Sequence, residues 1–125
     1  MMGLDTQIAK PHTGNTRYLD DLRTWISNHL DVEYSSTALA ARAGVSVSWM
    51  QRSFKREFGY TVFKYIRGER LIRAQKQLEV TSMNIKSIAA GAGYRSVPAF
   101  TQAFSTTFGI TPARFKRQIK HWSDE

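Results

Sequence analysis

A group of polar and cationic side chains between Ser46 and Gly59 has the chemistry needed to read the edges of DNA base pairs. If this stretch forms a helix, six polar or cationic residues lie on or beside one side of it. They are Ser48, Trp49, Gln51, Arg52, Lys55 and Arg56, which supply a hydroxyl, an indole, an amide and three cationic groups. Arginine pairs through two hydrogen bonds with guanine, glutamine does so with adenine, and lysine neutralises phosphates. The stretch therefore predicts a DNA-reading surface. Taken alone, it is also compatible with an ordinary solvated helix face.

The residues around this surface predict a helix-turn-helix. Gly44 stands where the chain needs a positive φ to turn between two helices, and Ser46 can cap the second helix by accepting a backbone N–H. Four apolar residues at helical spacing form the expected inner stripe of the second helix: Val47, Met50, Phe54 and Phe58. The first helix is expected to be capped by Ser35, Ser36 or Thr37.

The same pattern occurs again about fifty residues later, which indicates an internal repeat of one structural unit. At an offset of fifty, Phe54, Phe58, Gly59 and Thr61 are followed by Phe104, Phe108, Gly109 and Thr111. At an offset of forty-nine, Leu39, Ala40 and Gly44 are followed by Ile88, Ala89 and Gly93. The change of offset predicts one additional residue in the second turn. In this second copy, Asn84 or Ser82 is expected to cap the first helix and Ser96 the second.

The second copy presents a less charged surface than the first. Its expected contact residues are Arg95 and Ser96 before the helix, Val97, Gln102 and Ser105 on the outer face with Pro98 and Thr106, and Thr101 on the flank. No lysine or arginine occurs on this outer face. Two interpretations remain open: Val97 contacts a thymine methyl group, or the second copy grips mainly the DNA backbone through helix N-termini and Arg95.

The remaining segments are expected to support the two copies. Residues 16–30 predict an amphipathic helix behind the first copy, with Asp20, Asp21 and Arg23 on its outer face. A helix over the eighteen residues 61–78 is about 27 Å long at 1.5 Å per residue. Successive major grooves lie roughly 34 Å apart, so this helix can help set the separation of two reading surfaces.

The predicted fold is all-α, with about seven helices and two helix-turn-helix subdomains. Four segments follow along the chain: a flexible arm at residues 1–15, the first subdomain at 16–60, a linker helix at 61–80 and the second subdomain at 81–125. The chain of 125 residues carries 18 basic and 10 acidic side chains, a net charge of +8, which favours a polyanionic partner. Residues 1–35 hold five of the acidic side chains and three basic ones, so the positive charge belongs to the repeats.

Several function classes fit the sequence poorly. The three histidines are far apart and there is no cysteine, so neither a metal site nor a thiolate site is expected. We find no Gly-rich phosphate loop, nucleophile–base set or paired carboxylates, and therefore expect no catalysis and no cofactor. No apolar run approaches the ~20 residues that span a bilayer, and the first residues do not resemble a signal peptide. We expect a cytoplasmic protein that does not associate with membranes. No feature indicates a small-molecule effector.

A non-specific architectural DNA-binding or RNA-binding protein is the main alternative, because the net charge would serve it equally well. Such proteins need insertion wedges or exposed stacking aromatics. Most of the phenylalanines here fall on the inner stripes, and only Trp49 is expected to be free. A sequence-specific regulator is favoured.

The second copy and the linker also carry a family resemblance. The pattern Phe100-x₃-Phe104-x₃-Phe108-Gly109-Ile110-Thr111-Pro112-x₂-Phe115, preceded by Ala92-Gly93-Tyr94, resembles the signature of the AraC/XylS family of bacterial transcription regulators. Arg70-Leu71-x₂-Ala74-x₃-Leu78 resembles the linker of that family. The resemblance covers roughly residues 20–118 and is strongest to the single-domain MarA/SoxS group.

This resemblance implies a monomer that inserts two helices into adjacent major grooves of double-stranded DNA and recruits RNA polymerase as an activator. It also implies the bacterial cytoplasm, with association to the nucleoid when DNA is bound. The chain departs from the family at three places, one of which is that the MarA/SoxS group has polar residues where Val97 and Pro98 stand. The family usually has a basic residue where Gln102 stands, and the MarA/SoxS group has its tryptophan where Ser48 stands, one position before Trp49.

Overall fold

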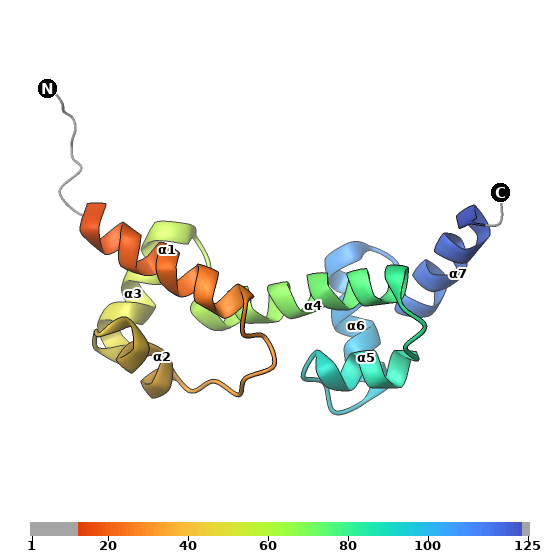
Figure 1. Cartoon of the computed structure of the whole chain (residues 1–125), viewed down its shortest axis with the longest axis horizontal. Coiled ribbons are helices and arrows are strands. Elements are labelled where there is room, and N and C mark those ends of the chain that lie inside the picture. The colour runs from red at the N-terminus through yellow and green to blue at the C-terminus, as the bar shows by residue number, and fades with distance from the viewer. Residues whose placement is uncertain (1–12, 124–125) are drawn as a thin grey trace, which may run out of the picture. The chain divides into compact units, whose positions relative to one another are not determined.

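Seven helices and no strand make up the part of the chain that this computed structural model describes, which confirms the all-α prediction. The backbone is described for residues 13–123 and the side chains for residues 17–120. The helices are α1 (Thr13–Ser27), α2 (Ser36–Ala43), α3 (Val47–Phe58), α4 (Val62–Val80), α5 (Ile85–Gly91), α6 (Val97–Phe108) and α7 (Pro112–Ser123) (Figure 1). Most of the predicted N-terminal arm lies outside the described residues, and α1 begins inside its last part.

The chain divides into two units, residues 1–66 and residues 67–125, and the division falls inside α4. The first turn of α4 contributes Val62 and Ile66 to the core of the first unit. The rest of α4 contributes Leu71, Ala74 and Leu78 to the core of the second unit. The segment that the sequence analysis set apart as a linker is therefore a structural part of both units.

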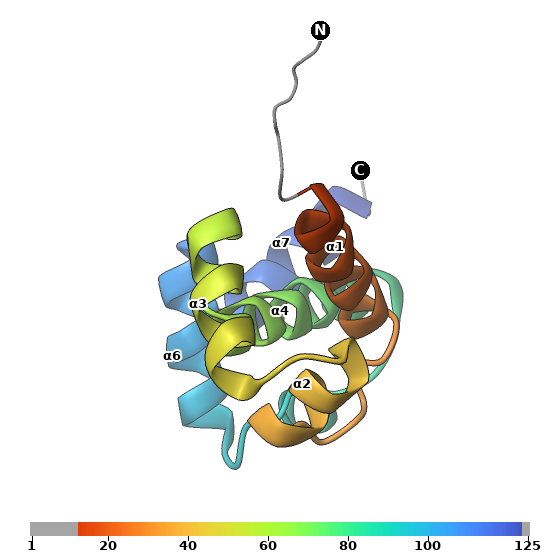
Figure 2. The same cartoon turned by 90° about the vertical axis from the view of Figure 1, so that its left-hand side faces the viewer.

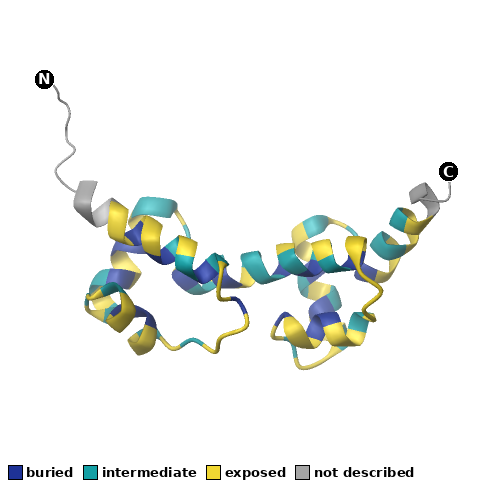
Figure 3. Ribbon diagram, in the orientation of Figure 1, coloured by how far each residue is buried: buried dark blue, intermediate teal, exposed yellow. Residues whose placement is uncertain are grey.

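The first core lies between α1, the α2–α3 pair and the start of α4 (Figure 3). Its buried members are Leu19, Leu22, Ile26, Leu30, Leu39, Ala40, Met50, Phe54, Val62 and Ile66. Figure 2 shows α1 beside α2 and α3, which it contacts. The helix ends at Ser27, three residues before the predicted end at Leu30, and the Asn28 N–H donates to the carbonyls of both Thr24 and Trp25. Such a tightened last turn is common at helix ends, and Leu30 stays in the core.

The second core repeats this arrangement with different supporting residues. Its buried members are Leu71, Ala74, Leu78, Ile88, Ala89, Ala92, Phe100 and Phe104. Leu71, Ala74 and Leu78 of α4 have the same spacing as Leu19, Leu22 and Ile26 of α1. In the second unit, α4 therefore takes the place that α1 has in the first.

Both helix turns have the geometry that the sequence predicted. Gly44 has a φ of +73° and Gly93 a φ of +93°, a region that glycine enters at no steric cost. The N-caps are Ser35 and Ser46 in the first unit and Asn84 and Ser96 in the second. Ser35 is thus the cap among the three candidates for α2, and Asn84 is the cap among the two candidates for α5. The Val45 N–H donates to the Ala40 carbonyl, and the Tyr94 N–H donates to the Ala89 carbonyl. Both the donors and the acceptors of these two hydrogen bonds are forty-nine residues apart. Since the following caps are fifty residues apart, Arg95 is the additional residue of the second turn.

Candidate nucleic-acid interface

Helix α3 presents most of the predicted reading residues to solvent. Ser48, Gln51, Arg52, Lys55 and Arg56 are all exposed. The helix is held by its opposite side, where Met50 and Phe54 have no accessible surface. The Ser46 Oγ accepts the Trp49 N–H at 3.1 Å, and Gly59 ends the helix with a φ of +84°. The rotation of α3 about its axis is thus fixed by the core, which in turn fixes the direction of the polar side chains.

Trp49 is less available than the sequence analysis expected. The indole is half-buried and packs against the first core instead of standing free on the outer face. The residue lies in the first turn of α3, and helical side chains lean back toward the N-terminus of their helix. Only part of its ring can contact a ligand at this surface.

The cations of α3 have weak partners within the described residues. The Arg52 Nε lies 3.4 Å from the carbonyl oxygen of Ser48, and the Arg56 guanidinium lies 3.5 Å from the Oγ of Ser53. The Gln51 amide donates to the Oγ of Ser36 at 3.5 Å. These distances are at the long limit for hydrogen bonds, and no carboxylate pairs with the two arginines or with Lys55 in the described part of the chain. The groups remain free to bind an anion.

A groove of about 740 Å³ follows this surface in the first unit. Gln51, Arg52, Lys55 and Arg56 line it from α3. Thr61, Val62 and Phe63 line it from the N-terminal end of α4. The groove therefore joins a cationic wall to two apolar side chains.

Arg23 is a support of α3 that the sequence analysis did not find. It was expected on the outer face of the first helix, but its guanidinium lies 4.0 Å from the centre of the Phe58 ring and donates to the Oη of Tyr60 at 3.1 Å. The Ser27 Oγ and the Tyr65 Oη lie 2.7 Å apart beside it. Such cation–ring contacts stabilise by about 0.5–2 kcal/mol. The aromatic rings that draw Arg23 inward come from residues 35 and more positions away, so periodicity alone could not place this side chain.

Helix α6 presents a smaller polar surface than predicted. Pro98, Gln102 and Thr106 are exposed, whereas Thr101 is half-buried. Val97 was expected to face outward, but it is half-buried and packs against the second core. Val47, its counterpart at an offset of fifty, packs against the first core in the same way. Both residues begin their helices, where the side chain leans back over the preceding turn.

Ser105 is also withdrawn from the predicted outer face. The residue is half-buried, and its Oγ is buried without a hydrogen-bond partner. It occupies the position that Lys55 has in the first unit. Arg95 and Ser96 are exposed as predicted. Around α6, the turn before the helix therefore carries an exposed cation, Arg95, and α6 itself carries no lysine or arginine.

Arginines of α4 hold the second turn in place, a role that the sequence analysis did not assign. The Arg73 guanidinium donates to the Gly91 carbonyl at 2.8 Å, at the end of α5. Burial raises the pKa of the Tyr94 hydroxyl, and the positive charges of Arg67 and Arg70 oppose that rise. The hydrogen bond of Arg73 thus ties α4 to the end of α5, shortly before the turn that carries Arg95 and Ser96.

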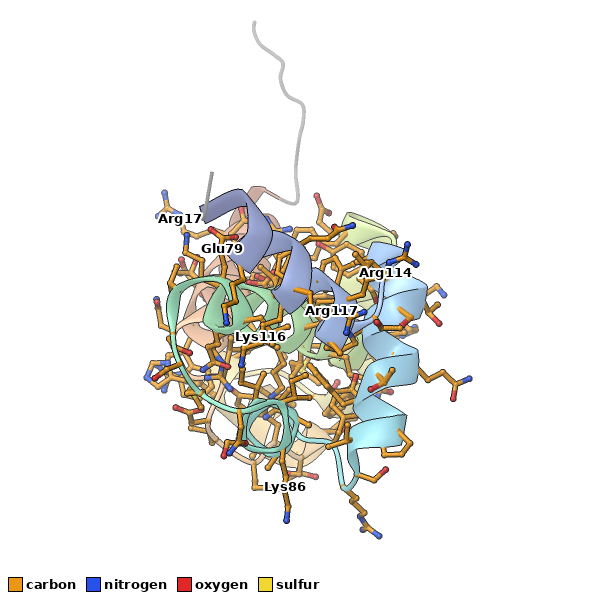
Figure 4. All side chains as sticks on the ribbon, turned by 90° about the vertical axis from the view of Figure 1, so that its right-hand side faces the viewer. Arg17, Glu79, Lys86, Arg114, Lys116 and Arg117 are labelled. Atoms are coloured by element: carbon orange, nitrogen blue, oxygen red, sulfur yellow. The ribbon has the colours of Figure 1, made fainter. Side chains whose placement is uncertain are left out.

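Helix α7 adds cations beside α6. Figure 4 shows Arg114 and Arg117 extending from α7, with Arg114 drawn next to α6, and both are exposed. Lys116 is half-buried, and its Nζ donates to the Met83 carbonyl at 3.2 Å.

The described part of the chain has neither a candidate metal site nor a candidate membrane span. No group of three or more His, Cys, Asp or Glu side chains there could hold a metal ion. No helix in the same part of the chain is long and apolar enough to cross a bilayer.

The sequence and the fold of this chain are similar to those of known helix-turn-helix DNA-binding domains. A family model described as a helix-turn-helix domain matches residues 39–118. The chain is 38% identical over 103 residues to the transcriptional regulator Rob of Salmonella typhimurium, which covers 82% of this chain but only 35% of Rob. It is 31% identical over 103 residues to the regulatory protein SoxS of Escherichia coli, covering 82% of this chain and 96% of SoxS. The chain thus spans about a third of the length of Rob and matches nearly all of SoxS.

A solved structure shows the same fold in contact with a ligand. The DNA-binding domain of AdpA, a global transcriptional factor, was crystallised in complex with a target DNA. It superimposes on this chain with a TM-score of 0.77 at 25% sequence identity, covering 86% of this chain and 96% of that domain.

Proposed function

Because the chain belongs to the AraC-type helix-turn-helix family, we propose that it is a transcription regulator that binds specific sequences of double-stranded DNA. It would do so as a monomer, through two subdomains at residues 16–60 and 81–125 joined by residues 61–80. The observation that carries this proposal is the set of exposed cations on α3, which have no carboxylate partner among the described residues; buried Met50 and Phe54 fix the rotation of this helix. The DNA complex of the related AdpA domain supports the same ligand class.

The first unit supplies the base contacts in this proposal. Arg52 lies at the centre of the exposed face of α3 and is assigned to a guanine, with Gln51 beside it for an adenine. Lys55 and Arg56 lie toward the C-terminal end of the helix and are assigned to phosphates. Ser48 and the exposed part of Trp49 complete the contact surface.

The second unit is proposed to position the protein more than to read bases. Among its exposed cations, Arg95 lies before α6, and Arg114 and Arg117 lie after it. On α6 itself, Gln102 is the exposed residue with the longest hydrogen-bonding side chain. At the N-terminus of α6, Pro98 has no N–H and the Ala99 N–H donates to the Ser96 Oγ, so a phosphate there would be bound by the Val97 N–H. With Val97 packed against the core, a thymine methyl contact from this residue is disfavoured.

We further propose that the regulator activates transcription by contacting RNA polymerase, and that it works in the bacterial cytoplasm, at the nucleoid when bound to DNA. The proposal follows from the likeness to SoxS, which the chain matches over nearly its whole length. Mutual stabilisation of polymerase and this protein on a promoter carrying a selected site would support it. Independent binding of the two on every such promoter would contradict it.

Selection from random duplexes with the purified chain tests the function directly. We expect one asymmetric site of about twenty base pairs, because two different reading helices would span two neighbouring major grooves. Sedimentation of the complex on a short duplex should give one chain per site. A selection that yields no consensus would favour the non-specific architectural alternative, and two chains per site would contradict the monomer.

A further inference from the structure

The groove beside α3 has a chemistry that base reading alone does not require. Its wall consists of the amide and three cations of α3, and the apolar side chains of Val62 and Phe63 lie where α4 begins. Val62 is 1% exposed, whereas Phe63 is half-buried and packs against the first core with part of its ring accessible. All of these residues belong to the first unit. The groove is therefore a single continuous surface.

The charges of the groove favour an anionic ligand. Its lining includes Arg52, Lys55 and Arg56 but no acidic residue. Three like charges along one wall repel one another, and an anionic occupant would relieve that repulsion. The apolar side chains, however, would gain nothing from a bare anion. The fitting occupant combines anionic groups with apolar faces.

The second copy of the repeat lacks this chemistry. At an offset of fifty, the lining residues Arg52, Lys55, Arg56 and Phe63 correspond to Gln102, Ser105, Thr106 and Ala113. All three cations have become neutral polar residues and the aromatic ring has become a methyl group. Thr61 corresponds to another threonine, Thr111. The turn before the next helix is therefore the same in both copies, whereas the residues that line the groove differ. The combination is specific to the first unit.

We propose that this groove holds one strand of the DNA duplex, with phosphates on Lys55 and Arg56 and a deoxyribose against the ring of Phe63. The inference rests on the proposed function and adds Phe63 to the contact surface. A DNA strand carries anionic phosphates beside apolar sugar faces, and the groove places a cationic wall beside apolar side chains. Phe63 thereby contributes affinity that depends neither on salt nor on base sequence, which distinguishes it from Arg52, Lys55 and Arg56 of the same groove.

The experiment compares Phe63→Ala with Lys55→Ala by titration against a selected duplex and a scrambled duplex at several salt concentrations. Loss of the ring contact should weaken binding to both duplexes roughly five- to tenfold, with an unchanged dependence on salt. Lys55→Ala should also weaken both, but should lower the slope of log K against log[salt] by about one. Phe63→Leu keeps most of the apolar surface and should stay within about twofold of the wild type. Thermal melting of each variant verifies that the fold is intact.

Three outcomes would overturn the proposal. Phe63→Ala binding within about twofold of the wild type would mean that no strand lies against the ring. A lower salt slope for Phe63→Ala would mean that the variant disturbs the cations instead of the sugar. The third concerns duplexes with uracil in place of thymine: if the effect of Phe63→Ala vanished on them, the ring would contact a thymine methyl and not a sugar.

Two controls separate this proposal from its premise. Ala113→Phe places a ring at the equivalent position of the second unit and should change affinity by less than about twofold, since the cationic wall is missing there. If the wild type bound selected and scrambled duplexes equally, the proposed function would fail. The groove assignment would still be tested, because both Phe63→Ala and Lys55→Ala act on binding to any duplex.

Discussion

At the scale of single residues, Arg52 and Gln102 occupy equivalent positions on α3 and α6, and both are exposed. A bidentate arginine–guanine pair contributes about 1–3 kcal/mol of discrimination. Arg52→Ala should therefore weaken binding to the selected site about ten- to a hundredfold and flatten the preference at one or two positions of one half-site. Titration against matched and singly substituted duplexes measures both effects.

The matched control is Gln102→Ala. It removes no charge and leaves no buried group unpaired, so it should cost less than about 1 kcal/mol, with little change in base preference. A loss of specificity as large as that of Arg52→Ala would contradict the proposed asymmetry, because α6 would then read bases despite its neutral face.

Local signals made the turn residues and caps predictable. Gly44 and Ser46 act through their own φ or through a backbone N–H three residues away, so their roles follow from adjacent sequence. The orientations of Arg23, Trp49 and Val97 depend instead on which distant rings or core residues lie nearby. Helical periodicity gives the side of a helix on which a residue lies, but not whether a residue near the edge of that side turns inward. All three residues are half-buried, and so less exposed than predicted.

At the scale of elements, the repeat made the reading helices predictable. Helices α3 and α6 have equal lengths of twelve residues and begin and end at positions fifty apart. The double use of α4 could not be predicted from its periodicity, because its apolar residues serve two cores in turn. Nor could the groove beside α3, since it forms only where the start of α4 folds back against α3.

Two glycine-to-alanine substitutions should have opposite effects on stability. Gly44 has a φ of +73°, so Gly44→Ala forces a side chain into the left-handed region and should destabilise the first unit by about 1–2 kcal/mol. Gly68 lies inside α4 with nothing within 4 Å of the position of an added Cβ, so Gly68→Ala should stabilise by about 1 kcal/mol. Chemical denaturation of the two variants measures both changes. Destabilisation by Gly68→Ala would show that the glycine permits a bend in α4.

At the scale of the whole molecule, the net charge of +8 is distributed over both repeats and not gathered in one segment. Exposed cations lie on α3 in the first unit and in the turn before α6 and on α7 in the second. We therefore expect both units to contribute to the electrostatic part of binding, although only α3, and not α6, carries lysine or arginine. Affinity should depend on both units even where specificity depends mainly on one.

This distribution predicts a steep dependence of affinity on salt. If both units together contact six to ten phosphates, log K against log[salt] should have a slope of roughly −5 to −9, because each contact releases counterions from the duplex. Arg95→Ala should reduce the slope by about one, as a phosphate contact from the second unit does. Lys116→Ala is the control, since its ammonium already donates to the Met83 carbonyl, and it should leave the slope nearly unchanged. A wild-type slope shallower than about −3 would mean that the exposed cations of one or both units do not lie against the DNA backbone.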